Sequence, residues 1–100
     1  LGAILRSELQ SIQSPMVGDV RGKGLFNAID IIPHKGKNAW DVCLKMKENG
    51  LLAKPTHDHI IRFAPPLIIT EEQLYDCIEI IRSSIYAFAS WYLELMLYLV

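Results

Sequence analysis

The sequence predicts an α+β fold in which helices pack on a small antiparallel sheet. Three segments repeat apolar residues at helical spacing, and short runs rich in β-branched residues lie between them. Clusters of Gly, Pro, Asn and Ser separate these runs and supply the turns that such a sheet needs. Because 100 residues bury enough surface for one core, we expect a single domain.

The first third of the chain is expected to form a helix and two strands. The helix ends near Ser11, because the residue before Pro15 is pushed out of the helical region. Residues 17–20 begin extended structure, and the two glycines within residues 21–24 favour a bulge or tight turn. Residues 25–32 alternate and are rich in β-branched side chains, which is typical of a half-buried strand.

A second helix and two short strands follow a loop at residues 33–37. Asn38 is the candidate N-cap of this helix, and Asn-Gly at residues 49–50 is a stop signal. Its apolar residues at helical spacing are Ala39, Val42, Cys43 and Met46. Residues 51–54 and 60–63 are expected to be neighbouring antiparallel strands, because the residues between them have turn chemistry.

The last predicted helix begins after Thr70. Thr70 and Gln73 match a capping box, in which each side chain accepts from the other residue's backbone N–H. The stripe that this helix is expected to bury is Leu74, Cys77, Ile78, Ile81 and Ile85.

Composition excludes several classes of function. The chain is 51% hydrophobic and 21% charged with a net charge of -1, so it lacks the basic excess that binding a nucleic acid demands. Cys43 and Cys77 fall inside predicted helices, where a packed, reduced thiol is the expected state and a reducing compartment fits. Arg6 and Glu8 interrupt the apolar stretch that a signal peptide would need.

The two ends of the chain are unusual. No methionine opens the sequence, so we expect the chain to be the end of a longer protein. Residues 87–100 are apolar with Glu94 as their one charge, but they are shorter than the roughly 20 residues of a membrane-spanning helix. We expect this apolar stretch to be either exposed and aggregation-prone or buried against a partner chain.

Arg62 is the strongest functional candidate. It stands inside an otherwise apolar run at residues 60–69, and a guanidinium among such neighbours needs an anionic partner. The planar fork suits a carboxylate, which could come from the protein or from a ligand. The alternative is an edge strand on which the stem of Arg62 is buried and its head is in water.

Other constellations are weaker. His57 and His59 offer two metal ligands, which is too few for zinc without a third. Cys43 with a histidine could imitate a nucleophile pair, but no orienting group stands at a defined position. Arg21 with Lys23 could hold a phosphate beside glycine amides, but a bulge with solvated charges is the favoured interpretation of the pair.

Three segments carry a resemblance to a known family. They are Val-Arg-Gly-Lys-Gly-Leu at residues 20–25, Asn-Gly-Leu-Leu-Ala-Lys-Pro-Thr-His at residues 49–57, and Ile-Ile-Arg-Phe-Ala-Pro-Pro-Leu at residues 60–67. Together they resemble the C-terminal small domain of class-III pyridoxal-phosphate-dependent aminotransferases, and within that class the ornithine aminotransferases. The resemblance covers about residues 1–88, so it implies a domain at residues 1–88 and an apolar tail at residues 89–100 that does not match the family. Within the domain, the family usually has glycine where Asp58 stands.

The resemblance implies a fold-type-I enzyme that moves the δ-amino group of ornithine to 2-oxoglutarate and yields glutamate semialdehyde and glutamate. It implies that Arg62 pairs with a glutamate of the large domain and is then freed to bind the α-carboxylate of 2-oxoglutarate. The Schiff-base lysine and the other residues that hold pyridoxal 5'-phosphate belong to that large domain. Lys54 is no substitute, since no phosphate-binding loop or acidic pyridine partner stands near it.

This chain alone is therefore expected to be inactive, with no catalytic, cofactor-binding or metal-binding residue of its own. The family further implies amino-acid and 2-oxo-acid substrates, an oligomer built from dimers, and the mitochondrial matrix; without the resemblance, the cytoplasm is the expected location. The competing hypothesis is a free-standing, non-enzymatic α+β module that binds a small carboxylate or a protein partner through Arg62 and the apolar tail.

Overall fold

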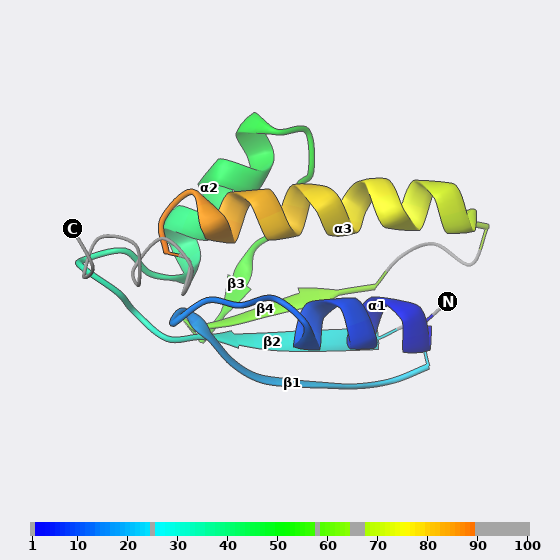
Figure 1. Ribbon diagram of the computed structural model, residues 1–100, viewed down its shortest axis with the longest axis horizontal. Helices are drawn as coiled ribbons and strands as arrows, with labels where there is room; N and C mark the ends of the chain where they lie inside the picture. Colours follow the sequence, from blue (N-terminus) through cyan, green and yellow to red (C-terminus); the bar gives the residue numbers. More distant parts are fainter. Residues whose placement is uncertain (1, 25, 58, 65–67, 90–100) are drawn as a thin grey trace.

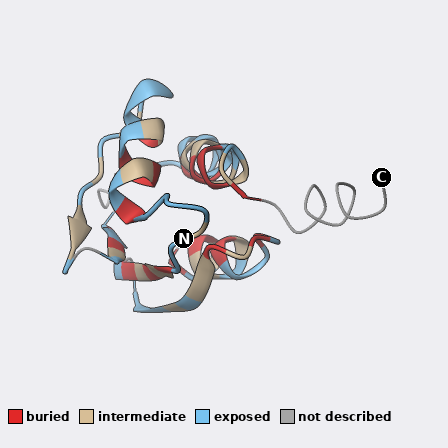
Figure 2. Ribbon diagram, turned by 90° about the vertical axis from the view of Figure 1, so that its left-hand side faces the viewer, coloured by how far each residue is buried: buried red, intermediate tan, exposed pale blue. Residues whose placement is uncertain are grey.

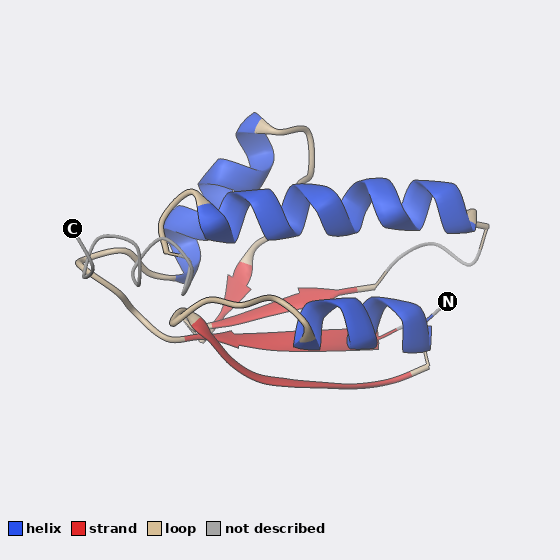
Figure 3. Ribbon diagram, viewed as in Figure 1, coloured by secondary structure: helices blue, strands red, loops and turns tan. Residues whose placement is uncertain are grey.

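A computed structural model describes the chain except residues 1, 25, 58, 65–67 and 90–100. The fold is the predicted one, a small antiparallel sheet with helices packed on it (Figure 3). The elements are α1 (Gly2–Gln10), β1 (Val17–Lys23), β2 (Phe26–Ile31), α2 (Ala39–Glu48), β3 (Pro55–Thr56), β4 (Ile60–Phe63) and α3 (Glu71–Tyr86).

The four strands form one sheet in the order β1-β2-β4-β3, and every neighbouring pair is antiparallel. Helix α1 packs against β1 and β2, helix α2 packs against β3 and β4, and α3 packs against both helices (Figure 1). The strand order makes β4 an interior strand of the sheet, with β2 on one side and β3 on the other.

One hydrophobic core fills the space between the helices and one face of the sheet. Burial alternates along the strands, as the bands of colour on the strands in Figure 2 show and as a pleated sheet dictates. The buried residues that point into this core are Ile29 and Ile31 of β2 and Ile61 and Phe63 of β4. The intervening residues point to the other face, which none of the described helices covers. We call this second surface the open face of the sheet.

A polar clamp joins α1 to the β1–β2 hairpin. The side chain of Asn27 is buried, and its Oδ1 accepts a hydrogen bond of 2.9 Å from Arg6 Nε. Asn27 Nδ2 donates to the carbonyl of Gly2 at 3.4 Å, and Arg6 Nη2 donates to the carbonyl of Gly24 at 3.2 Å. Buried polar groups are stable only when they are paired, so this clamp fixes α1 across the end of the hairpin.

Both predicted helix starts are confirmed. Asn38 caps α2 and Thr70 caps α3, each within a complete capping box whose second members are Asp41 and Gln73. Asn49 is the C-cap of α2, as the stop signal predicted. Most of the predicted stripe of α3 is buried, but Cys77 is only half-buried.

The predicted turn at residues 21–24 is largely wrong. Arg21, Gly22 and Lys23 continue β1 and pair with β2, and only Gly24, with φ +61°, lies in the turn. The register shift that marks a bulge lies earlier, between Val17 and Val20. The glycine at position 22 serves close strand packing, so its presence does not mark a turn.

The third strand is also displaced from its predicted place. Residues 51–54 are not a strand, because the chain is still leaving α2 there and Leu51 N donates to the carbonyl of Met46 at 2.8 Å. The strand β3 consists of two residues, Pro55 and Thr56, which pair antiparallel with β4 as predicted.

Most of the predicted apolar tail lies outside the described residues. Ala89 is the exception: it is buried in the core, and its carbonyl accepts a hydrogen bond of 2.7 Å from Ser14 Oγ. Within the part of the chain that the structure describes, no helix has the length and apolar character to cross a membrane.

Candidate functional site

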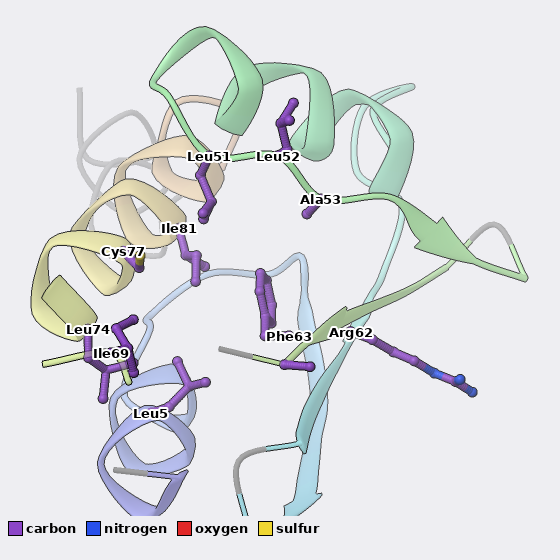
Figure 4. Close-up of a pocket in the computed structure, with 11 residues that line it drawn as sticks. Leu5, Leu51, Leu52, Ala53, Arg62, Phe63, Ile69, Leu74, Cys77 and Ile81 are labelled. Carbon is purple, nitrogen blue, oxygen red and sulfur yellow. The ribbon is translucent and has the colours of Figure 1, made fainter. Parts of the chain in front are cut away.

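Arg62 lies on β4, an interior strand of the sheet, but β3 pairs only with Ile60 and Ile61, so Arg62 itself pairs with β2 alone. The predicted edge-strand alternative is therefore wrong for β4 as a whole, while its expectation of an exposed head agrees with the exposed Arg62 side chain. Its neighbours in sequence, Ile61 and Phe63, point into the core, so strand alternation places the Arg62 side chain on the open face. In Figure 4 its guanidinium extends away from the core side of the sheet. The side chain is exposed, and pairing with Ala28 of β2 holds the Arg62 backbone.

Behind β4 lies an apolar cavity of about 240 Å³ (Figure 4). The residues that line it include Phe63, Leu51, Leu74 and Cys77. Among the described lining residues, only Arg62 has a charged side chain. Since the guanidinium points away from it, the cavity offers no group for a charged ligand. The core residues around the cavity support the strand that carries Arg62.

On the open face, Arg62 stands beside Ala28 of β2, and Ala28 in turn stands beside Arg21 of β1. A hollow of about 380 Å³ runs over this row and is bounded further by Lys23 and Phe26. Phe26 is 72% exposed. None of the described residues forms a hydrogen bond or an ion pair with the Arg62 guanidinium, so this cation is available to an anion from elsewhere.

Arg21 is different, because its guanidinium is already occupied. Arg21 Nη1 donates to Asp30 Oδ2 at 3.1 Å and to Asp19 Oδ2 at 3.2 Å. Hydrogen bonds to Asp30 and then to Asp19 raise the pKa of the Arg21 guanidinium. The hypothesis that Arg21 and Lys23 together hold a phosphate is therefore disfavoured, because two carboxylates already neutralise Arg21.

The sequence alone does not predict this ion-pair cluster of Arg21, Asp19 and Asp30. Asp30 is the charged residue between Ile29 and Ile31 of β2, and this alternation places it on the open face. Its partner cannot be identified without the register between β1 and β2. The register brings Arg21 and Asp30 to the same face of adjacent strands. A one-residue slip would place them on opposite faces.

The remaining sequence candidates are not brought into a chemical site. No group of three or more metal-ligating side chains occurs among the described residues. His59 Nδ1 faces the carbonyl of His57 within a tight turn, where His57 adopts φ +55°. This contact is local turn structure between a ring nitrogen and a backbone oxygen.

Both cysteines are poor nucleophiles. Burial raises the pKa of the Cys43 thiol from 9.0 to about 11, and burial followed by the charge of Asp76 raises the pKa of Cys77. Because the thiolate is the reactive form, neither side chain is activated at neutral pH. This disfavours the predicted pairing of Cys43 with a histidine as a nucleophile.

The buried Cys43 thiol makes stability depend on pH. Above pH 9 the unfolded chain loses this proton while the folded chain retains it up to about pH 11, so the free energy of unfolding falls as the pH rises through this window. We expect a loss of about 2 kcal/mol. Urea unfolding at pH 8.5 and 10.5 measures this loss. The Cys43→Ala variant should lack the part of the pH dependence that comes from the thiol. An equal fall in the free energy of unfolding in both proteins would show that Cys43 is not its source.

Lys54 does not form a cofactor site. It is exposed at the edge of a groove of about 450 Å³, whose other lining residues include Trp40, Leu44, Leu52 and Lys47. No carboxylate that could face a pyridine nitrogen lines this groove among the described residues. The residues present therefore do not fit pyridoxal phosphate.

Proteins of known function are similar to this chain over most of its length. An ornithine aminotransferase of Emericella nidulans is 56% identical over 87 residues, which are 85% of this chain and 19% of that protein. The mitochondrial ornithine aminotransferase of Rattus norvegicus is 54% identical over 88 residues, which are 88% of this chain and 20% of that protein. The chain thus spans about a fifth of the length of these relatives.

Solved structures show the same likeness. An ornithine aminotransferase of Plasmodium yoelii superposes with a TM-score of 0.80 and 46% identity, over 88% of this chain and 24% of that one. An acetylornithine aminotransferase of Elizabethkingia anophelis gives a TM-score of 0.80 and 53% identity, over 87% of this chain and 24% of that one. The sequence model of the family described as "Aminotransferase class-III" matches residues 1–85. The chain belongs to the class-III aminotransferase family.

Proposed function

We propose that this chain is the C-terminal part of an ornithine aminotransferase and that Arg62 is its substrate-binding residue. The whole enzyme would transfer the δ-amino group of ornithine to 2-oxoglutarate, giving glutamate semialdehyde and glutamate. Residues 1–88 would be its small domain, which the buried Ala89 extends by one residue, and the rest of residues 89–100 would be an added tail. The observation that carries the proposal is the exposed Arg62 guanidinium on an interior strand, with no partner among the described residues.

The role of Arg62 follows from its chemistry and its support. A guanidinium stays charged at every physiological pH and binds a carboxylate through two parallel hydrogen bonds. Pairing of Arg62 with Ala28 of β2, together with the burial of Ile61 and Phe63 in the core, fixes the direction from which the fork is presented. The side chain can exchange one carboxylate for another without any change in the backbone.

Class-III aminotransferases use pyridoxal phosphate, which supplies an electron sink for the carbanion formed at the substrate carbon. The described residues of this chain do not fit that group, so we place its binding in the four-fifths of the relatives that this chain does not span. This chain alone would then be inactive.

Several relatives have names that state a mitochondrial location. We extend that location, in the matrix, to the protein that contains this chain. Assembly into dimers or larger oligomers is proposed on the same footing. The competing hypothesis of a free-standing binding module is not favoured, since the relatives match more than four-fifths of the chain.

The test uses a full-length chimera in which residues 1–89 replace the matching segment of the rat enzyme. Arg62→Ala should weaken the half-reaction with 2-oxoglutarate by about 2 kcal/mol, roughly thirtyfold in kcat/KM, because a carboxylate loses its charged partner. The half-reaction with ornithine should be nearly unchanged. Single-turnover kinetics with each substrate separately measures the two effects.

Two controls sharpen this test. Arg62→Lys should recover only part of the loss, because an ammonium keeps the charge and loses the bidentate fork. Arg82→Ala removes an arginine that bridges Glu8 and Glu79 in the helical layer, so it should not discriminate between the two half-reactions. Equal damage to both half-reactions by Arg62→Ala would contradict a substrate-binding role.

A further inference from the structure

Asp30 lies between two arginines on the open face. Ala28 pairs with Arg21 on one side and with Arg62 on the other, and Asp30 follows two residues later on the same face of β2. Diagonal neighbours across one strand gap are about 7–8 Å apart, which an arginine side chain can span. Either arginine is thus placed to take the Asp30 carboxylate.

In the structure Arg21 takes it. Arg21 Nη1 lies 3.1 Å from Asp30 Oδ2 and also holds Asp19 at 3.2 Å, so two carboxylates gather on one guanidinium. The other oxygen, Asp30 Oδ1, is buried and makes no hydrogen bond in the described part of the chain. A carboxylate with an unfilled acceptor would attract a second cation within reach.

We infer that Arg21 is a positioning residue that holds Asp30 away from Arg62 and so keeps the Arg62 fork available to a carboxylate from outside the chain. The identity of that external carboxylate rests on the proposed function, whereas the competition between Arg21 and Arg62 does not. Lys23 does not substitute for Arg21, because it pairs with Phe26 and lies farther from Asp30 along the strands.

The inference predicts what a neutral residue at position 21 would do. In Arg21→Gln, Asp30 loses its partner and Arg62 becomes the nearest arginine on the open face. Arg62 should then bind Asp30, and an external carboxylate would compete with an internal one. Removing the charge of Asp30 in the same background should release Arg62 again.

The first experiment needs no ligand. In the 100-residue chain, the NMR signal of Arg62 Nε–Hε should shift in Arg21→Gln and return toward its original position in Arg21→Gln/Asp30→Asn. The matched control Arg21→Gln/Asp19→Asn removes the other carboxylate and should leave the shifted signal in place. An Arg62 signal that does not move in Arg21→Gln, or that Asp30→Asn does not restore, overturns the inference.

Titration of the same variants with glutarate separates the inference from the proposed function. The parent chain should show a change at Arg62 that saturates and that Arg62→Ala removes. Arg21→Gln should weaken this binding about two- to fivefold, the range for an exposed ion pair, and the double variant should restore it. Unaltered glutarate binding in Arg21→Gln overturns the inference. Ligand-free shifts as expected, with no response of Arg62 to glutarate in any variant, support the inference and count against the proposed function.

Discussion

Replacing Gly22 by alanine is expected to destabilise the fold by about 4 kcal/mol, more than most overpacking substitutions cost, because the added atom meets backbone atoms. A Cβ at this position would meet the carbonyl oxygen of Phe26 and Oδ1 of Asn27, and would lie 2.9 Å from Asn27 Cα. None of these atoms is the free end of a flexible side chain. The clamp from Arg6 holds the Asn27 amide, and β-pairing holds the backbone, so the strands themselves must separate.

Urea unfolding of Gly22→Ala beside the parent chain measures this loss. The matched control is Gly24→Ala, where a Cβ would meet no atom within 4 Å but the residue adopts φ +61°. That variant should lose about 1 kcal/mol, the cost of a left-handed conformation for an L-residue. A Gly22→Ala variant as stable as the Gly24→Ala variant would show that β1 and β2 are less closely packed than described.

Truncation of Ile29 to alanine is expected to cost about 3–4 kcal/mol, within the range for a large aliphatic side chain in a closed core. Ile29 is fully buried at the centre of β2, opposite Val20 of β1 and Ile61 of β4. Its loss leaves a cavity in the core beneath β2, next to Ile61 of the strand that carries Arg62. Thermal and urea unfolding of the variant provide the measurement.

Phe26→Ala is the control on the same strand, because Phe26 is exposed on the opposite side. Its effect should stay within about 0.5 kcal/mol, as for most surface substitutions. A comparable loss at both positions would mean that the open face is covered in solution. In that case Arg62 would not be available to a small carboxylate.

Local signals predicted the helices well. Helices α2 and α3 are defined by residues close together in the sequence, namely a capping box at Asn38 or Thr70 and an apolar stripe. Neighbouring side chains therefore suffice to predict them. The strands were predicted less accurately. The extension of β1 through Arg21 and the placement of β3 at Pro55 depend on pairing partners that are distant in sequence.

The candidate site shows the same division. The apolar run around Arg62 is enough to predict that this residue is functional, because a charge among such neighbours demands a partner. Its place on an interior strand and its availability on the open face required the order of the strands and the register between β2 and β4. The competition for Asp30 required a third strand as well, and no local pattern encodes it.

The strand order has a consequence for how this site assembles during folding. Strands β1 and β2 form one hairpin from adjacent chain, and β3 and β4 form another, but β2 and β4 meet only after α2 and its flanking loops have been closed. Closing that loop costs entropy before the Ala28–Arg62 contact is gained. A nascent chain can therefore hold both hairpins and still lack the site, which first exists when the two hairpins dock.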